Sequence, residues 1–251
     1  DRADRAALTI TANIQPSTDS GSATSGTASV AVVNVAANDQ VNGFAAVLGV
    51  GGNATVSQVS TTNPGVSLDP VTGEVNVAAS VQPGSYTLTY SLCDRNSPVN
   101  CANSTVNVSV AASILPSTDT GTATSGVAGT AVANVAANDT VNGTPAVLGS
   151  NATVAESGTW PAGITLDPAT GAVSTSAAVQ PGVYTLTYQL CDLNSPVNCA
   201  TSTVTLTVAA DIAPVADTGS AVSGTASTPV ANVAANDLVN GAPATLGAGG
   251  N

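Results

Sequence analysis

YTLTYQLCDLNSPVNCATSTVTLTV, residues 184–208, contains two alternating apolar and polar runs around a short polar loop. In the first run Tyr184, Leu186, Tyr188 and Leu190 fall on one side of a period-two pattern, with threonine and glutamine between them. Such alternation is typical of a strand with one buried and one solvent-exposed face. Valine and leucine alternate with threonine in the second run. The stretch therefore predicts an antiparallel hairpin closed by the turn-rich DLNSPVN.

The same stretch occurs at residues 86–110, and both copies carry a Cys-x7-Cys pair. Zinc binding would favour histidine partners or Cys-x-x-Cys spacing, and the chain has no histidine and no such spacing. Facing strands of a hairpin bring side chains within disulfide reach. We therefore expect one disulfide per hairpin, which indicates an oxidising, extracellular compartment. The expected pairs are Cys93 with Cys101, and Cys191 with Cys199.

Internal repetition sets the domain organisation. NVAANDQVNG at residues 34–43 returns as NVAANDTVNG at 134–143 and as NVAANDLVNG at 232–241. A spacing of about one hundred residues corresponds to one domain per repeat. We expect two full repeats at 14–112 and 113–210, and the N-terminal half of a third at 211–251. Residues 1–13 match the last strand of a preceding repeat.

Composition excludes several function classes. The net charge is −12, and the chain has no lysine and no histidine, so a phosphate-binding surface for nucleic acid is excluded. No apolar run approaches the roughly 18 residues of a membrane-spanning helix. No Ser-His-Asp arrangement exists, and the few acidic residues lie in turn-like contexts. We therefore expect no enzyme activity and no membrane insertion of this segment.

Strand and turn signals predict an all-β protein. In the second repeat we expect strands near 121–125, 130–135, 146–148, 152–156, 164–166 and 172–174, followed by the hairpin. Asn142-Gly143 favours a turn with positive φ, and residues 167–171 favour a type I turn closed by glycine. About seven short strands per repeat indicate tandem immunoglobulin-like β-sandwich domains. The junctions are short and carry proline, which predicts short stiff linkers that join the domains end to end.

Three phrases give the chain a resemblance to a known family. They are Pro-x-x-x-Asp-x-Gly with a downstream Ala-Asn-Asp, Leu-Asp-Pro-x-Thr-Gly, and Pro-Gly-x-Tyr-Thr-Leu-Thr-Tyr before Cys-Asp. Over nearly its whole length the chain resembles the tandem immunoglobulin-like or bacterial cadherin-like repeats of large bacterial surface adhesins and extracellular fibres. The resemblance implies a β-sandwich that acts as an extender on a bacterial cell surface, often with calcium at the domains.

Acidic residues recur at equivalent positions and give a candidate calcium site. Calcium takes six to eight oxygen ligands, mainly carboxylates and carbonyls. Two aspartates, an asparagine and backbone carbonyls would supply them in each repeat; alternatively, these residues cap turns through hydrogen bonds to the backbone. We otherwise expect no cofactor. The candidate ligands are Asp19, Asn38 and Asp39 in the first repeat, and Asp119, Asn138 and Asp139 in the second.

The sequence thus favours a structural function, as a stalk or fibre segment whose partners are neighbouring repeats or other copies of the same protein. Two alternatives remain open. One is a polymerising fibre subunit whose third repeat is completed by strands of a neighbouring chain. The other is a calcium-dependent module that binds carbohydrate or protein. Trp160, which precedes Pro161, either contacts a partner or covers one end of the sandwich.

Overall fold

The computed structural model describes residues 10–96 and 99–251. The chain divides into two compact units, one formed by residues 1–113 with 142–144 and the other by residues 114–141 with 145–251. Residues 1–9, which belong to the predicted last strand of a preceding repeat, lie outside the described residues. No helix in the described ranges is long and apolar enough to cross a membrane.

The predicted hairpin is confirmed in both units. In the first unit it consists of β9 (Gly84–Asp94) and β10 (Cys101–Ala111), which pair antiparallel with Leu88 opposite Val106 and Cys93 opposite Cys101. Burial alternates along β9, so that Leu88, Tyr90 and Leu92 are fully buried while Thr89 and Ser91 between them are only partly buried. The period-two sequence pattern therefore corresponds to the two faces of the strand, because the apolar face packs inward and the polar face is exposed to water.

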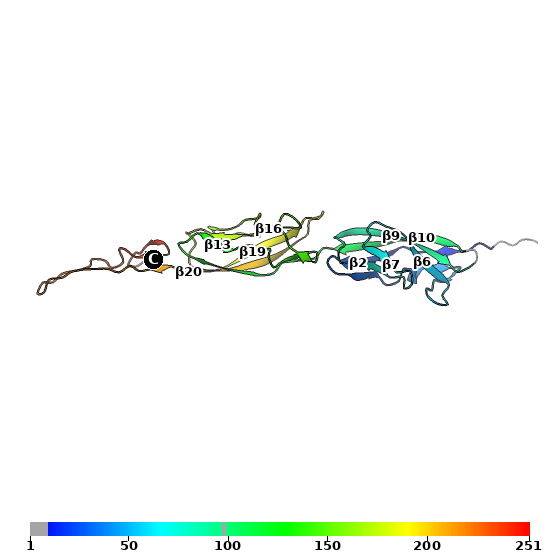
Figure 1. Ribbon diagram of the computed structural model, residues 1–251, viewed down its shortest axis with the longest axis horizontal. Coiled ribbons are helices and arrows are strands. Elements are labelled where there is room, and N and C mark those ends of the chain that lie inside the picture. Colours follow the sequence, from blue (N-terminus) through cyan, green and yellow to red (C-terminus); the bar gives the residue numbers. More distant parts are fainter. Residues whose placement is uncertain (1–9, 97–98) are drawn as a thin grey trace, which may run out of the picture. The chain divides into compact units, whose positions relative to one another are not determined.

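Seven strands of the first unit form two sheets, as Figure 1 shows for the half that carries β2, β6, β7, β9 and β10. The four-stranded sheet has the order β2-β10-β9-β6, the second has the order β3-β8-β7, and a small third sheet has the order β1-β4-β5. The remaining elements are β1 (Ile14–Gln15), β2 (Asp19–Thr24), β3 (Ser29–Val32), the 3-10 helix η1 (Val35–Asn38), β4 (Gln40–Val41), β5 (Phe44–Ala45), β6 (Ala54–Thr61), β7 (Val66–Leu68) and β8 (Val75–Val77).

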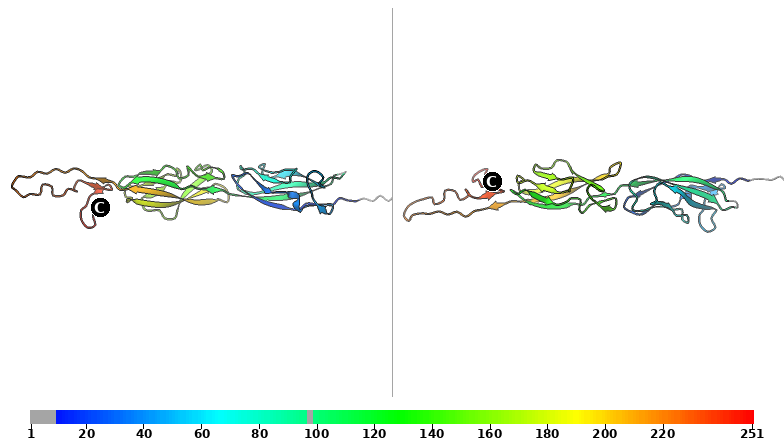
Figure 2. Two further views of the ribbon diagram at one scale, coloured as in Figure 1. Left: turned by 90° about the horizontal axis from the view of Figure 1, so that it is seen from below. Right: turned by 45° about the horizontal axis from the view of Figure 1, so that its top comes forward.

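The second unit repeats this topology with the sheets β12-β20-β19-β16, β13-β18-β17 and β11-β14-β15, followed by β21-β22-β23. Its long hairpin strands extend along the unit in both views of Figure 2. The elements are β11 (Ile114–Leu115), β12 (Asp119–Thr124), β13 (Gly129–Val132), β14 (Thr140–Val141), β15 (Thr144–Pro145), β16 (Ala152–Ser157), β17 (Ile164–Leu166), β18 (Val173–Thr175), β19 (Gly182–Asp192), β20 (Cys199–Ala209), β21 (Ile212–Ala213), β22 (Leu238–Val239) and β23 (Ala242–Pro243). The seven strands of the two larger sheets in each unit agree with the predicted β-sandwich.

Each unit has its own core of small aliphatic side chains between its sheets. The members from the hairpin are leucines, valines and one fully buried tyrosine, and those from the opposite sheet are mostly valines. Threonine and valine suit half-buried pleated positions, and the apolar halves of these strands supply the burial that stabilises the fold. The fully buried members of the first core are Val35, Ala54, Val66, Val75, Leu88, Tyr90, Leu92 and Val106.

Asparagine residues build two turns at each small sheet, one before it and one between two of its strands. The Asn34 side-chain oxygen accepts a hydrogen bond from the Ala36 amide at 2.9 Å, which starts η1. Asn42 and Gly43 both have positive φ, 54° and 82°, as the Asn-Gly pair predicts. The same pair in the second unit, at 142–143, has φ values of 52° and 77°.

Two predicted strands differ from the structure. The strand expected at 130–135 ends at Val132, because the Asn134 side chain caps the following turn by accepting from the Ala136 amide. The segment 146–148 forms no strand apart from one isolated bridge at Leu148. There the Asn151 side chain accepts from the Val147 amide and donates to the Pro145 carbonyl, so side-chain bonds replace a strand ladder.

Trp160 lies in the core of the second unit. It is 9% exposed, and its indole N–H donates to the Thr187 carbonyl at 2.8 Å. The structure therefore favours the second of its two expected roles, coverage of the sandwich, over contact with a partner.

Variants of Trp160 should separate the stability that comes from its apolar packing from the stability that comes from its hydrogen bond to the Thr187 carbonyl. Trp160→Ala should lower the unfolding free energy of the second unit by about 3 kcal/mol, because it leaves a cavity. Trp160→Phe keeps most of the apolar contact and should cost less, about 1 kcal/mol for the lost hydrogen bond. Denaturant unfolding followed by circular dichroism measures both, and equal losses for the two variants would contradict a packing role.

Candidate functional site

The predicted ligand residues of the first repeat meet around the hydroxyl of Tyr90. Asp39 follows η1, and its Oδ1 accepts from the Ser17 amide at 2.7 Å. Tyr90 lies on β9, and its hydroxyl is 2.9 Å from Asp39 Oδ2, 3.0 Å from the Ser17 carbonyl and 3.4 Å from the Val35 carbonyl. Both side chains are buried, Asp39 at 2% and Tyr90 at 0% exposure. The cluster therefore joins the central strand to two segments that cross the end of the sandwich.

The second repeat builds the same cluster from Asp139, Ser117 and Tyr188. Asp139 Oδ1 accepts from the Ser117 amide at 2.7 Å, and the Tyr188 hydroxyl lies 3.0 Å from Asp139 Oδ2 and 2.9 Å from the Ser117 carbonyl. Equivalent residues of the two repeats therefore form equivalent clusters.

The asparagine predicted as a ligand bonds the backbone in both repeats. In the second repeat the Asn138 side-chain amide donates to the Thr118 carbonyl at 3.2 Å, and the Asn138 carbonyl accepts from the Ser117 hydroxyl at 3.1 Å. Asn38 makes the equivalent contacts in the first repeat. Ordinary turn capping therefore accounts for the asparagine.

Asp19 and Asp119 complete the two clusters. One carboxyl oxygen of each, Oδ2, is enclosed and has no hydrogen-bond partner. Burial, with the neighbouring Asp39, raises the pKa of Asp19 from 3.8 to about 6, and burial likewise raises the pKa of Asp119 to about 6.

Burial also affects the other members of the cluster. It raises the pKa of Asp39 and of Asp139, although the hydrogen bonds from Ser17 and Ser117 act in the opposite direction. Burial raises the pKa of the Tyr90 and Tyr188 hydroxyls well above their usual value, and the adjacent carboxylates add to the shift. Both tyrosines therefore keep their proton and remain hydrogen-bond donors over the whole working range of pH.

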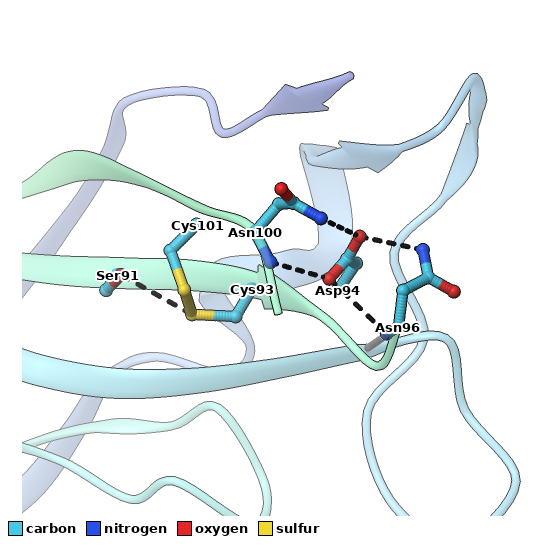
Figure 3. The surroundings of a disulfide bond; sticks show 6 residues. All are labelled: Ser91, Cys93, Asp94, Asn96, Asn100 and Cys101. Atoms are coloured by element: carbon cyan, nitrogen blue, oxygen red, sulfur yellow. Dashed lines mark hydrogen bonds between the residues drawn. A yellow bond between two sulfur atoms is a disulfide. The ribbon is translucent and has the colours of Figure 1, made fainter. Parts of the chain in front are cut away.

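The hairpin turn forms a second cluster of predicted site residues. Cys93 and Cys101 form a disulfide across the end of β9 and β10, and Cys191 and Cys199 form the equivalent one across β19 and β20. Figure 3 shows Asp94 beside the first disulfide, between the side chains of Asn96 and Asn100. The carboxylate accepts from the Asn100 amide at 2.8 Å and from the Asn96 side chain at 2.7 Å.

These bonds define Asp94 and Asp192 as caps of the turn. The backbone N–H of Asn100 lowers the pKa of Asp94. Burial acts to raise the pKa of Asp192, but the donors from Asn198 and Asn194 outweigh it, and the pKa is lowered. Both carboxylates stay ionised and occupied by their own loop.

Sequence reasoning missed the tyrosine as the centre of the candidate site. It placed the tyrosines on the buried face of the predicted strand, which describes Tyr90 and Tyr188 but omits their hydroxyl contacts. Tyr86 and Tyr184 are only partly buried, and their hydroxyls donate to the Gln82 and Gln180 carbonyls at 2.7 Å. The available signal was that a fully buried tyrosine needs an acceptor for its hydroxyl, and that buried aspartate is the strongest one in the repeat.

No protein-family model and no curated protein matches the chain. Similar solved structures are cadherin ectodomain fragments. Protocadherin gammaB7 EC3-6 has 17% sequence identity and a TM-score of 0.32, and the match covers 78% of this chain and 50% of that one. Mouse Cadherin-23 EC22-24 has 18% identity, a TM-score of 0.33 and coverage of 78% and 65%, and human CDH23 EC21-23 has 17% identity, a TM-score of 0.36 and coverage of 81% and 73%. The chain thus spans half of the protocadherin fragment. At these identities and TM-scores the likeness supports no transfer of function, and the sandwich rests on the strand pairing above.

The buried carboxyl groups predict a stability that depends on pH. The folded pKa of Asp19 and Asp119, about 6, lies above the unfolded value of 3.8. Their stabilisation is therefore complete below about pH 3.8 and is lost as the pH rises through about 6. After allowance for solvent screening of half-buried groups, we expect a loss of about 1 kcal/mol per repeat between pH 5 and pH 8.

Thermal melting of the full chain at the two pH values measures this loss. The variant Asp19→Asn/Asp119→Asn replaces both groups by neutral isosteres and should remove most of the difference. The turn aspartates Asp94 and Asp192 do not titrate in this range, because their pKa values are lowered. An undiminished pH difference in the double variant would contradict the assignment.

Proposed function

We propose that the chain is a load-bearing segment of an extracellular stalk or fibre, of the kind that extends from a bacterial surface. The observation that carries this proposal is the parallel pairing of the first and last long strands in each unit. β2 pairs with β10 from Asp19 opposite Val106 to Thr24 opposite Ala111. β12 pairs with β20 in the same register, from Asp119 opposite Val204 to Thr124 opposite Ala209.

Parallel terminal strands resist tension in a particular way. After β1, the chain enters the paired segment at the start of β2 and leaves it at the end of β10, and these points lie at opposite ends of that segment. Tension along the chain therefore pulls the two strands past each other and loads the ladder of six residue pairs together. In an antiparallel terminal pair the bonds would open one after another, so the parallel arrangement favours a mechanical role.

The hairpin disulfides add to the support. Each one joins the last strand to the central strand, Cys101 of β10 to Cys93 of β9 in the first unit and Cys199 of β20 to Cys191 of β19 in the second. In the chain-entropy account a loop of this length stabilises the fold by about 2.5 kcal/mol. Disulfides persist in oxidising surroundings, which supports an extracellular location.

The composition agrees with a structural role. The chain has no histidine and no lysine, and its net charge is −12. The buried titratable groups of the described residues are tyrosines and aspartates that bond one another or their own loops. These features support a non-enzymatic segment whose neighbours are further repeats or other copies of the protein.

Single-molecule stretching of the full chain tests the proposal. Two unfolding events of similar force are expected, one per complete repeat. Single proline variants Ser22→Pro and Ala23→Pro are compared, because alternate N–H groups of a strand point to the same neighbour. The variant that removes a hydrogen bond of the β2–β10 ladder should lower the unfolding force of the first repeat. The second repeat is unchanged, so its unfolding event serves as an internal control.

Reduction of the disulfides adds a second readout. Each disulfide joins cysteines with a sequence separation of 8, so the residues between them cannot extend while it is intact. In reducing buffer the extension released by each unfolding event should therefore increase by about 25 Å. If the unchanged chain and both proline variants unfold at forces too low to resolve, the load-bearing role is overturned.

A fibre subunit completed by a neighbouring chain is the second candidate. Val35 and Val135 are fully buried, whereas the equivalent Val233 is 59% exposed, because no strand among the described residues covers it. A strand pair of the β19–β20 type would cover this position. Light scattering of the purified chain across a concentration series should then show growing assemblies, and Val233→Asp should suppress them; a concentration-independent monomer would reject this candidate.

A further inference from the structure

Most of the oxygens that would have to hold calcium in the first repeat already accept hydrogen bonds. Both Asp39 carboxylate oxygens accept bonds, from the Ser17 amide and the Tyr90 hydroxyl. The Ser17 carbonyl accepts from the Ser104 hydroxyl and lies 3.0 Å from the Tyr90 hydroxyl. Asp19 Oδ2 is the one enclosed carboxyl oxygen of this cluster without a partner. Calcium takes six to eight oxygens, so the donor set does not fit it.

The Tyr90 hydroxyl lies where a cation would have to lie. It is within 3.0 Å of oxygens from two segments, Asp39 Oδ2 and the Ser17 carbonyl, and it also faces the Val35 carbonyl. Tyr188 repeats these contacts with Asp139, Ser117 and Val135. A hydroxyl hydrogen supplies positive charge to such acceptors without the desolvation of an ion.

The surrounding donors also oppose a cation. The Ser17 amide and the Asn38 side-chain amide point their N–H groups at Asp39 and at the Thr18 carbonyl. A cation bound to the same oxygens would meet these positive dipole ends and would have to displace them. No group of three or more cysteine, aspartate or glutamate side chains in the described ranges is arranged to hold a metal.

We propose that the tyrosine hydroxyl of each complete repeat takes the place of a bound cation, so that an internal O–H···carboxylate bond closes the end of the sandwich. The repeats are then independent of divalent cations for their stability. The residues that carry this role are Tyr90 with Asp39 in the first repeat and Tyr188 with Asp139 in the second.

Calcium addition to the full chain is the first test. Melting temperatures are compared in EDTA and in increasing CaCl₂, with NaCl adjusted to hold the ionic strength constant. The expected result is no change in melting temperature and no saturable heat of calcium binding in calorimetry. A saturable rise in melting temperature, or stoichiometric binding, would overturn the proposal.

A matched pair of tyrosine variants on β19 tests the hydroxyl itself. Tyr188→Phe removes the central donor and leaves buried acceptors without it, so the melting temperature of the second repeat should fall by about 4 °C or more. Tyr184→Phe removes a hydroxyl that bonds an exposed carbonyl, that of Gln180, and should have a smaller effect. Equal effects of the two variants would overturn the closing role of Tyr188.

Discussion

The burial of the inner face of one long hairpin is the interaction on which each unit depends. β9 and β19 are the central strands, and they contribute Leu88, Tyr90 and Leu92 in one unit and the equivalent Leu186, Tyr188 and Leu190 in the other. Val66, Val75 and Val77 of the opposite sheet belong to the same core as this face in the first unit. The same strands also carry the disulfide and the cluster tyrosine, so core, covalent link and candidate site share one element.

With only 7% charged residues, the chain has to stabilise the turns at the ends of its sandwiches without ion-pair networks. It uses short-range hydrogen bonds from asparagine and aspartate side chains to the backbone, at Asn34, Asp94 and Asn151 among others. The buried Asp–Tyr clusters extend this strategy to the interior. Their cost is the burial of carboxyl groups, which appears as raised pKa values for Asp19 and Asp119. The parallel β2–β10 and β12–β20 ladders begin at Asp19 and Asp119, which belong to these clusters.

The sequence predicted local features accurately where a short pattern has a single physical meaning. The alternation in 184–208 determined the hairpin, and Asn-Gly at 142–143 determined a turn with positive φ. The strand predicted at 130–135 ends early, at Val132, and the strand predicted at 146–148 is wrong, because asparagine side chains bond the backbone in both places. Asp19 and Asp39, two of the candidate ligands, lie in one cluster, but their bonding partners could not be predicted from sequence spacing.

The sequence by itself therefore determined the hairpins, the turn residues and the cysteine pairs, which depend on neighbours a few residues apart or across one hairpin. Only the tertiary structure decided which groups surround Asp39 and Asp139. Tyr90 is 51 residues from Asp39, and the Ser17 amide is 22 residues away on the other side. The parallel pairing of the terminal strands is likewise a long-range contact. Such contacts depend on how the two sheets stack, and a one-dimensional pattern carries no record of that.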